Sequence, residues 1–342
     1  KVCVFILRDL QDSYPRILKQ MKITKNLIEK EGVKVEFIDM AGKNMMEKIF
    51  SSIILGFWTS FWLAMEYKVD PTVDNQLGGA SMDANKPILE DGRTYHLHTC
   101  AGDIAPYCVL VGDPERAEMI AKKLFDEARL VGDHRGLKSF TGKGLGIPMS
   151  VVTTGMGPSS TAITLPEAVY SGAKRLIRVG SCSTLWRGAK PGDSAICTGA
   201  VRLDGASESW APIEYPAIAD YRVVGAMVES ARMLGLPYHV GIGATTACFN
   251  EGQARPDMNG YLPPRLLAMH DELVQRGVLF FSMEEATMFV WCTAHSHDIW
   301  AGAVDAIYGN RITNELEVRG EEEAANIAIR ALLILSLNYP IK

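Results

Sequence analysis

Short apolar stretches alternate with helix-like stretches from residue 108 onward, and this alternation limits the possible folds more than any other feature. The apolar stretches lie at 108–112, 147–155, 175–180, 194–201, 239–246, 278–282 and 299–308. The helix-like stretches lie at 114–125, 159–172, 221–235, 263–277, 283–296 and 321–337. Buried strands separated by helices are typical of sheets covered by helices on both faces. We therefore predict a three-layer α/β domain with ligand loops at the strand ends.

The composition is that of a folded globular protein and excludes several partners. The chain has 342 residues, a net charge of -5 and 47% hydrophobic residues, so we expect one large or two unequal packed units. No block of Lys and Arg occurs, so we expect no nucleic-acid partner. The seven cysteines are odd in number, scattered and never spaced as CxxC. This pattern favours free thiols in the cytoplasm over disulfides or a zinc site.

Residues 49–65 form an uncharged apolar run of about the minimum length of a membrane span. Lys48, Glu66 and Lys68 flank the run closely, and neither an aromatic belt nor an excess of cations on one side accompanies it. We therefore expect a helix buried in a core or in a dimer interface, and no membrane partner.

The sequence pattern changes near residue 78, which predicts two domains. Residues 1–77 contain a strand, a helix, a strand and the apolar run, as expected of a small α/β unit. Residues 78–87 contain several small residues that are typical of linkers. We expect the main domain to extend over 88–342.

The stretch 112–116, GDPER, indicates a possible anion site at the start of a helix. Gly112 ends a strand, Asp113 is a good N-cap, Pro114 suits the first helical position and Arg116 falls in the first turn. Backbone N–H groups at a helix start bind anions, and Arg116 would add a cation. The same stretch is also typical of a helix that is merely well capped.

Two further arginines strengthen the case for a bound oxyanion. Arg178 lies near a strand end, just before Gly180 and Ser181, whose amides a tight turn would expose. Arg135 lies on a loop. Guanidinium groups bind phosphate bidentately, so these two residues together with Arg116 favour an oxyanion ligand.

The loop 249–255, FNEGQAR, places three different binding groups within seven residues. Phe249 offers an aromatic face, Gln253 a primary amide and Arg255 a fork of N–H donors. These groups could contact the face and the polar edge of a flat ligand together.

Other candidate residues carry weaker signals. Glu284 and Glu285 fall in the first turn of a helix, where carboxylates suit the helix dipole. Glu284 could instead accept hydrogen bonds from a vicinal diol, which would leave Glu285 as the dipole partner. Cys182 lacks the glycine and the base of a nucleophile turn. The His-Ser-His stretch 295–297 lacks carboxylate neighbours, so we predict no metal site.

The motifs and their order resemble the uridine phosphorylases of the nucleoside phosphorylase superfamily over about 88–335. The motifs that carry the resemblance are GDPER, TTGMGPSSTAI, RVGSCSTL, VRLDGAS, FNEGQAR, SMEEAT and GNR. The resemblance implies a phosphorylase-like α/β/α domain with a mixed central sheet. It also implies phosphorolysis of uridine to uracil and ribose 1-phosphate, with phosphate as co-substrate and no cofactor.

The same resemblance implies a role for individual residues of the site. Uridine and phosphate would lie in a site shared across a homodimer interface, with Gln253, Arg255 and Arg178 as the catalytic residues. The residues implied to bind phosphate are Gly112, Arg116, Arg178 and Ser181, with Arg135 from the neighbouring subunit. The residues implied to bind ribose are Met283, Glu284 and His96, which crosses the interface. The residues implied to bind the base are Phe249, Gln253 and Arg255, with Arg311 behind it.

The base loop suits uracil for a physical reason. Uracil shows one N–H between two carbonyls, so the Gln253 amide can pair with it reciprocally while Arg255 donates to a carbonyl. A purine would leave these groups badly matched. The alternatives are a purine nucleoside phosphorylase, a nucleosidase that uses water, or a nucleoside-binding fusion protein without activity. Asp305 is a rival acid, although a lone Asp beside a strand end is more often structural.

This chain departs from the resembled family at several positions. The usual Thr-Thr-Gly after the phosphate arginine is Ser181-Cys182-Ser183. The Tyr-Glu before the ribose-binding pair is Phe281-Ser282, and an interface glutamate is replaced by Gly136, which weakens the case for an interface potassium ion.

Residues 1–76 resemble a different family, the archaeal bifunctional phosphoglucose/phosphomannose isomerases, at the C-terminal end of those proteins. The segments on which this resemblance rests are VFILRD, YPRILKQMKITKNLIEKEGVKVEF and GFWTSFWLAMEYKVDPT. That family builds its active site largely from residues upstream of such a segment. We therefore expect a fusion in which this unit is structural and does not isomerise sugars.

Overall fold

The computed structural model describes residues 3–9, 15–44, 46–48, 51, 55 and 85–341. The chain divides into two compact units, Lys1–Ser81 and Met82–Lys342. The predicted buried helix at 49–65 lies outside the described residues except for Ser51 and Leu55, and so does most of the predicted linker. Within the described part of the chain, no helix is long and apolar enough to span a bilayer.

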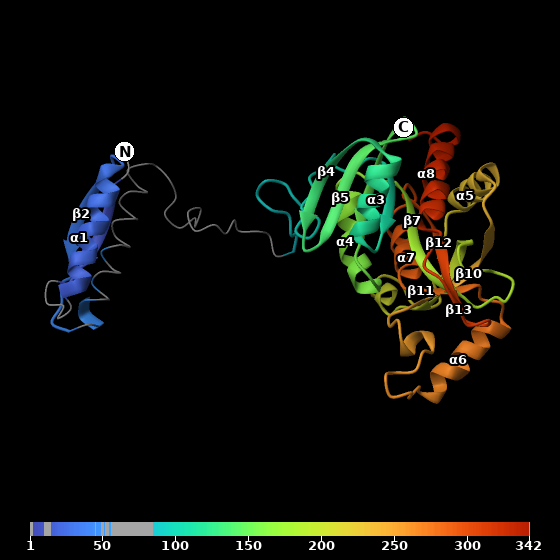
Figure 1. Cartoon of the computed structure of the whole chain (residues 1–342). Helices are drawn as coiled ribbons and strands as arrows, with labels where there is room; N and C mark the ends of the chain where they lie inside the picture. The colour runs from blue at the N-terminus through green and yellow to red at the C-terminus, as the bar shows by residue number, and fades with distance from the viewer. Residues whose placement is uncertain are drawn as a thin grey trace. The chain divides into compact units, whose positions relative to one another are not determined.

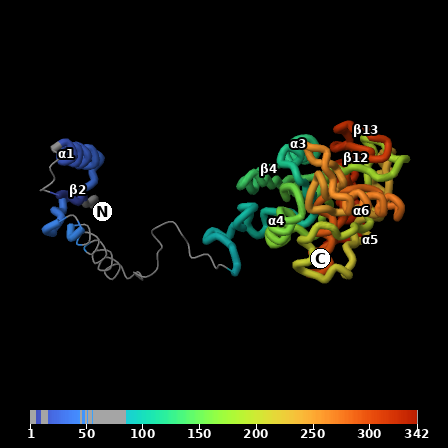
Figure 2. Tube along the Cα trace, turned by 90° about the horizontal axis from the view of Figure 1, so that it is seen from below, coloured from blue at the N-terminus to red at the C-terminus, as the bar shows by residue number. Residues whose placement is uncertain are grey.

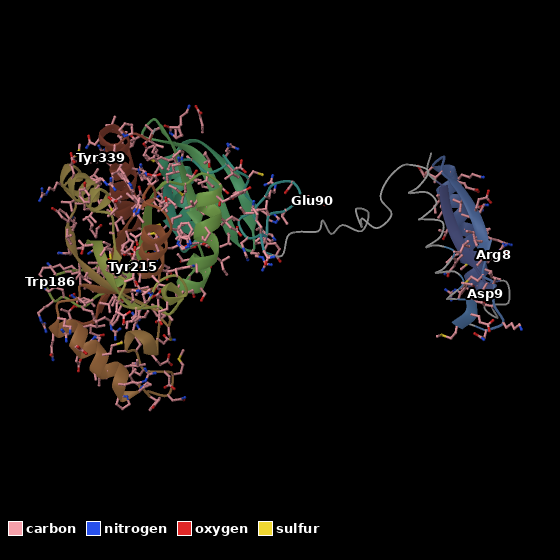
Figure 3. All side chains as sticks on the ribbon, turned by 180° about the vertical axis from the view of Figure 1, so that it is seen from behind. Arg8, Asp9, Glu90, Trp186, Tyr215 and Tyr339 are labelled. Atoms are coloured by element: carbon pink, nitrogen blue, oxygen red, sulfur yellow. The ribbon has the colours of Figure 1, made fainter. Side chains whose placement is uncertain are left out.

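The N-terminal unit has the predicted strand–helix–strand order. It contains β1 (Cys3–Arg8), α1 (Pro15–Lys30) and β2 (Lys34–Asp39), and the two strands pair in parallel. Arg8 and Asp9, at the end of β1, are labelled in Figure 3. Arg8 Nε donates to Asp39 Oδ1 at 2.7 Å, and the largely buried Lys48 Nζ donates to Asp9 Oδ1 at 2.8 Å. These ion pairs join the end of β1 to residues later in the unit.

The second unit is built around one large mixed sheet (Figure 1). Its main strands are β3 (Tyr107–Val111), β6 (Ile147–Thr153), β7 (Arg175–Thr184), β8 (Ser194–Leu203), β10 (Tyr238–Thr246), β11 (Phe280–Ser282) and β12 (Trp300–Asn310). Strands β6, β3, β7 and β12 run parallel, whereas β8 is antiparallel to β12 and β11 is antiparallel to β7. Strand β10 pairs with β8 on one side and with β11 on the other. Each of the strands β7, β12, β8, β10 and β11 therefore pairs with the next, and β11 pairs with β7 to close a ring.

Helices cover both faces of this sheet, so the predicted three-layer fold with a mixed sheet is confirmed. They are α3 (Pro114–Leu124), α4 (Pro158–Tyr170), α5 (Tyr221–Leu234), α6 (Pro264–Gln275), α7 (Glu285–His295) and α8 (Glu321–Asn338). Leu165 of α4 and Phe289 of α7 belong to one buried apolar cluster. Ile120 of α3, Met227 of α5 and Leu332 of α8 belong to a second cluster. Helices α5 and α8 lie side by side (Figure 1).

Local sequence signals explain where several of these elements begin and end. Asp113 Oδ1 accepts from the Glu115 amide at 2.9 Å and caps α3, with Pro114 at the first helical position as predicted. Gly235 ends α5 in the left-handed conformation, which glycine adopts without a steric cost. Figure 2 lets the chain be followed through this unit from α4 to β12 and β13 (Glu315–Leu316).

The apolar pattern did not indicate the hairpin of β4 (Asp126–His134) and β5 (Leu137–Gly144). These strands extend the sheet beyond β6, and β4 forms its edge. Most side chains of β4 are exposed, so the strand lacks the continuous apolar run of a buried strand. The short strands β9 (Ala217–Ile218) and β13 were missed for lack of length.

Candidate active site

The three residues predicted to bind a base lie together after β10. The chain forms a short 3-10 turn at Glu251–Gln253, and Ala254 then adopts φ +53°. Arg255 Nη1 donates to Phe249 O and to Gln253 Oε1, both at 2.6 Å. The Arg255 Cζ lies 4.0 Å from the centroid of the Phe249 ring. Gln253 is buried, whereas Phe249 is 56% exposed, so the loop presents an aromatic ring outward and an amide inward.

Arg311 holds this loop from the end of β12. Its Nη1 donates to Gln253 O at 2.8 Å and its Nη2 donates to Ala254 O at 3.0 Å. Within residues 85–341, neither Arg255 nor Arg311 forms an ion pair with a carboxylate. Burial and the charge of Arg311 lower the pKa of Arg255 to about 10, and burial lowers the pKa of Arg311. Two uncompensated cations at one loop favour a ligand that carries or develops negative charge.

Arg178 of β7 lies in a buried cluster with three carboxylates. Its Nη1 donates to Glu285 Oε1 at 3.0 Å and to Asp305 Oδ1 at 2.5 Å, and its Nη2 donates to Glu284 Oε2. The side chain of Arg178 is only 7% exposed, and Glu285 and Asp305 are fully buried. The Gly157 amide donates to Glu284 Oε1 at 2.7 Å. The structure therefore joins the predicted phosphate arginine to the predicted ribose carboxylate.

Among the described residues, this cluster pairs three acidic groups with a single cation, Arg178, which cannot neutralise all of them. Burial raises the pKa of Asp305 well above its usual value, and the charge of Glu285 raises it further. Burial also raises the pKa of Glu284, although the charge of Arg178 opposes this rise. Oδ2 of Asp305 has no hydrogen-bond partner among the described residues. Burial among these carboxylates therefore favours the neutral form of Asp305 more than in an exposed aspartate.

Sequence reasoning underestimated two members of this cluster. Glu285 does lie in the first turn of α7, but its fully buried carboxylate binds Arg178 and accepts from Ser282 Oγ. Asp305 faces the same guanidinium from β12. The available signal was a carboxylate within the otherwise apolar stretch 299–308, because a buried carboxylate needs a partner.

Arg116 of α3 is buried beside the same strand. Its Nη2 donates to Glu321 Oε1 at 2.7 Å and to Tyr308 Oη at 3.1 Å, and its Nη1 donates to Val179 O at 3.3 Å. Val179 adjoins Arg178 in the chain. The Nε groups of Arg116 and Arg178 are buried and have no acceptor among the described residues. Arg116 and Arg178, two of the three predicted phosphate arginines, therefore each keep an Nε donor without a partner in the described part of the chain.

Two glycine-rich turns and Ser181 complete this end of the sheet. Gly112 follows β3, and a Cβ there would lie 3.3 Å from Gly155 O. Gly157 adopts φ +87° before α4, and a Cβ there would lie 3.8 Å from Met283 Cε. The predicted tight turn at Gly180 and Ser181 is wrong, because β7 continues to Thr184 and Ser181 pairs with Ala306 of β12 inside the sheet. The turns that follow β3 and β6 thus reach the residues predicted to bind phosphate and ribose.

His96 and Arg135 both contact the side chain of Tyr95. His96 Nδ1 lies 2.7 Å from Glu167 Oε1, and the His96 ring packs edge-on against Tyr95 at 4.9 Å. Arg135 is exposed at φ +54° and donates from Nη2 to Tyr95 Oη at 3.1 Å. Within the described part of the chain, neither residue has a hydrogen bond or ion pair with Arg178 or the base loop.

Replacing Gly180 with alanine is expected to disrupt the Arg178 cluster. A Cβ at this position would lie 1.6 Å from Arg178 Nη1 and 2.0 Å from Asp305 Oδ1. We expect a loss of about 3 kcal/mol in the free energy of unfolding, measured by urea denaturation. Gly225 of α5 has no atom within 4 Å of its Cβ position, so Gly225→Ala should instead stabilise by about 0.5–1 kcal/mol. Equal stability of Gly180→Ala and the unchanged protein would contradict the role of Gly180.

Two sequence families match this chain. The Phosphorylase superfamily matches residues 106–337, which is more than half of the chain. The family described as the bacterial phospho-glucose isomerase C-terminal SIS domain matches residues 1–77. Both resemblances found in the sequence are thereby confirmed.

Individual relatives cover most of the second unit. The uridine phosphorylase of Thermococcus kodakarensis is 44% identical over 255 residues, which are 75% of this chain and 91% of that protein. The uridine phosphorylase of Klebsiella aerogenes is 35% identical over 65% of this chain and 88% of its own length. The guanosine phosphorylase of Halorubrum lacusprofundi is 30% identical over 64% of this chain and 83% of its own length. The fold, the family match and these relatives together show that the chain belongs to the phosphorylase superfamily.

Proposed function

We propose that this chain catalyses the phosphorolysis of uridine to uracil and ribose 1-phosphate, with inorganic phosphate as co-substrate and no cofactor. The observation that carries the proposal is the pair Arg255 and Arg311, two cations that hold the Gln253 loop without a carboxylate partner in residues 85–341. The identity of 44% to the uridine phosphorylase of Thermococcus kodakarensis supports uridine as the nucleoside.

Uracil binds to the edge formed by Gln253 and Arg255. Gln253 Oε1 accepts from Arg255 Nη1 at 2.6 Å, which sets the amide with its oxygen towards Arg255 and its N–H₂ group away from it. The amide then donates to one uracil carbonyl and accepts from the ring N–H, while Arg255 donates to a carbonyl. Phe249 contacts the ring. A purine leaves these buried groups unpaired, which weakens its binding.

Phosphate binds beyond the end of β3, beside Arg178 and Ser181 of β7. The unpaired Nε groups of Arg116 and Arg178 support this location, as does the start of α3 at Pro114, two residues after Gly112. Glu321 accepts from one Nη group of Arg116, and Glu284 accepts from one Nη group of Arg178. Phosphate takes the remaining donors, together with Ser181. Glu284 then accepts hydrogen bonds from the ribose diol beside Met283.

The reaction proceeds through an oxocarbenium-like sugar. As the bond between C1' and N1 lengthens, positive charge develops on ribose and negative charge on the base. Phosphate at Arg178 stabilises the sugar cation, while Gln253 and Arg255 stabilise the departing uracil anion. Phosphate then bonds to C1', and no covalent enzyme intermediate forms. The uncompensated charge of Arg255 and Arg311 supports this assignment.

The active protein is a cytoplasmic homodimer whose subunits complete each other's sites. His96 and Arg135 lie beside Tyr95 and have no hydrogen bond or ion pair with the described site residues of their own protomer. Arg135 is exposed. In the dimer, Arg135 adds a cation to the partner's phosphate site and His96 reaches the partner's ribose.

The N-terminal unit is an appended structural unit without isomerase activity. We place it at residues 1–77, followed by a linker at 78–87 and the phosphorylase domain at 88–342. The match to the C-terminal SIS domain of phospho-glucose isomerases over 1–77 supports the first boundary.

Uracil release is expected to require both uridine and phosphate. Purified full-length protein is incubated with uridine, with phosphate present or replaced by chloride at equal ionic strength, and uracil and ribose 1-phosphate are measured by chromatography. We expect both products with phosphate and neither without it. Release of uracil without phosphate would identify a nucleosidase, and uridine binding without release would identify a nucleoside-binding protein.

Inosine and guanosine test the purine alternative in the same assay. The guanosine phosphorylase of Halorubrum lacusprofundi, at 30% identity, makes this comparison necessary. We expect uridine to exceed both purine nucleosides by about 100-fold or more in kcat/KM, because a purine leaves the Gln253 amide and Arg255 unpaired. Faster cleavage of guanosine or inosine would overturn the assignment of the base site.

A further inference from the structure

The end of β7 brings a hydroxyl group to the base loop. Ser183 Oγ accepts a hydrogen bond from Arg255 Nη2 at 3.1 Å. Ser183 pairs with Phe281 of β11 on one side and with Gly309 of β12 on the other. It is half-buried, so it lies at the inner side of the loop that carries Arg255.

The proton of this hydroxyl is available to a ligand. A serine hydroxyl offers one donor as well as its acceptor lone pairs. In the bond to Arg255 it is the acceptor, since a guanidinium can only donate. Within residues 85–341, Ser183 Oγ has no other hydrogen-bond partner. Its donor is therefore unused beside a group proposed to bind the base.

The neighbouring strand leaves room for this hydroxyl. A Cβ at Gly309 would lie 3.2 Å from Ser183 Oγ, closer than an ordinary van der Waals contact. The usual residue of the resembled family at position 183 is glycine, which has no hydroxyl. Ser183 thus adds a polar group to the base site that the resemblance does not supply.

We propose that Ser183 is a specificity-determining residue of the base site, where it donates to the same carbonyl oxygen of the pyrimidine that accepts from Arg255. A carbonyl oxygen has two lone pairs and can accept both bonds. The neutral Ser183 also anchors Arg255 without cancelling its positive charge, as a carboxylate would. This inference rests on the proposed function.

Thio-substituted nucleosides test the assignment. The full-length protein and its Ser183→Ala and Ser183→Gly variants are assayed with uridine, 2-thiouridine and 4-thiouridine at saturating phosphate. Loss of one hydrogen bond should lower kcat/KM for uridine about five- to tenfold. Loss of the Ser183 hydroxyl should have little effect on the thio analogue in which sulfur replaces the carbonyl oxygen that accepts from Ser183, because sulfur is a weak acceptor. The KM for phosphate should not change, and Ser336→Ala in α8 is the matched control.

Each outcome decides the inference. A loss for uridine that is absent for one thio analogue supports it. Equal losses for all three nucleosides indicate a structural role and overturn it, as does full activity of both variants. Equilibrium binding of uracil, 2-thiouracil and 4-thiouracil provides the same comparison without turnover. If the wild-type protein releases no uracil but binding shows a loss for uracil that is absent for one thiouracil, only the proposed function is contradicted. If the wild-type protein does not bind uracil, both the proposed function and the role of Ser183 are overturned.

Discussion

Replacing Arg178 with methionine is expected to abolish detectable uracil release and to lower the free energy of unfolding by about 3–5 kcal/mol. The change removes the cation that, within residues 85–341, pairs with the buried Glu284, Glu285 and Asp305. It also removes a guanidinium proposed to bind phosphate. Stability is measured by urea denaturation, and activity by the phosphate-dependent uracil assay.

The stability lost in Arg178→Met should depend on pH in a defined direction. Burial raises the pKa of Asp305 and Glu284 in the folded protein, and loss of the cation raises it further. A carboxyl group with a raised folded-state pKa contributes stability that is fully present below its unfolded pKa and is lost as pH rises through its folded pKa. The free energy of unfolding of the variant should therefore be closer to that of the wild type at pH 5 than at pH 8.

A surface arginine serves as the control for this variant. Arg276 is largely exposed and pairs with Glu272 one helical turn away, so Arg276→Met should change stability by less than about 0.5 kcal/mol. Similar losses in both variants, or a loss in Arg178→Met that grows towards acid pH, would contradict the buried-charge explanation.

Gln253→Ala and Arg255→Met are each expected to lower kcat/KM for uridine by about 10²- to 10³-fold. Both changes remove hydrogen bonds to the base, and Arg255→Met also removes a positive charge opposite the departing uracil. The KM for phosphate should change little, because within residues 85–341 neither Gln253 nor Arg255 has a hydrogen bond with Arg116 or Arg178. Gln275→Ala at the exposed end of α6 is the matched control.

The pH profile gives this prediction a second test. The pKa of Arg255 is lowered to about 10 by burial and by the charge of Arg311, so the guanidinium is charged below that pH and loses its proton as pH rises through it. Activity of the wild type should fall across this range. The residual activity of Arg255→Met should lack this fall, and an identical alkaline limb in both proteins would show that Arg255 does not cause it.

Much of the fold could be predicted because its signals are local. The start of β7 at Arg175 follows from apolar periodicity, although the strand continues to Thr184 and not only to the predicted residue 180. The helix at 114–124 follows from the Asp113-Pro114 cap, which acts within a few residues. The base loop was also predictable, since Phe249, Gln253 and Arg255 lie within seven residues and a tight turn keeps them together. The edge strand β4 was missed because its exposed side chains lack the pattern of a buried strand.

What the sequence by itself determined is therefore the order of strands and helices and the groups that each loop carries. Only the tertiary structure decided the partners of the buried arginines. Glu285 and Asp305 lie 107 and 127 residues from Arg178, and Glu321 lies 205 residues from Arg116. Residue spacing cannot specify such pairs, because they form only when the sheet and helices bury these charges and each then needs an opposite charge or a hydrogen-bond partner.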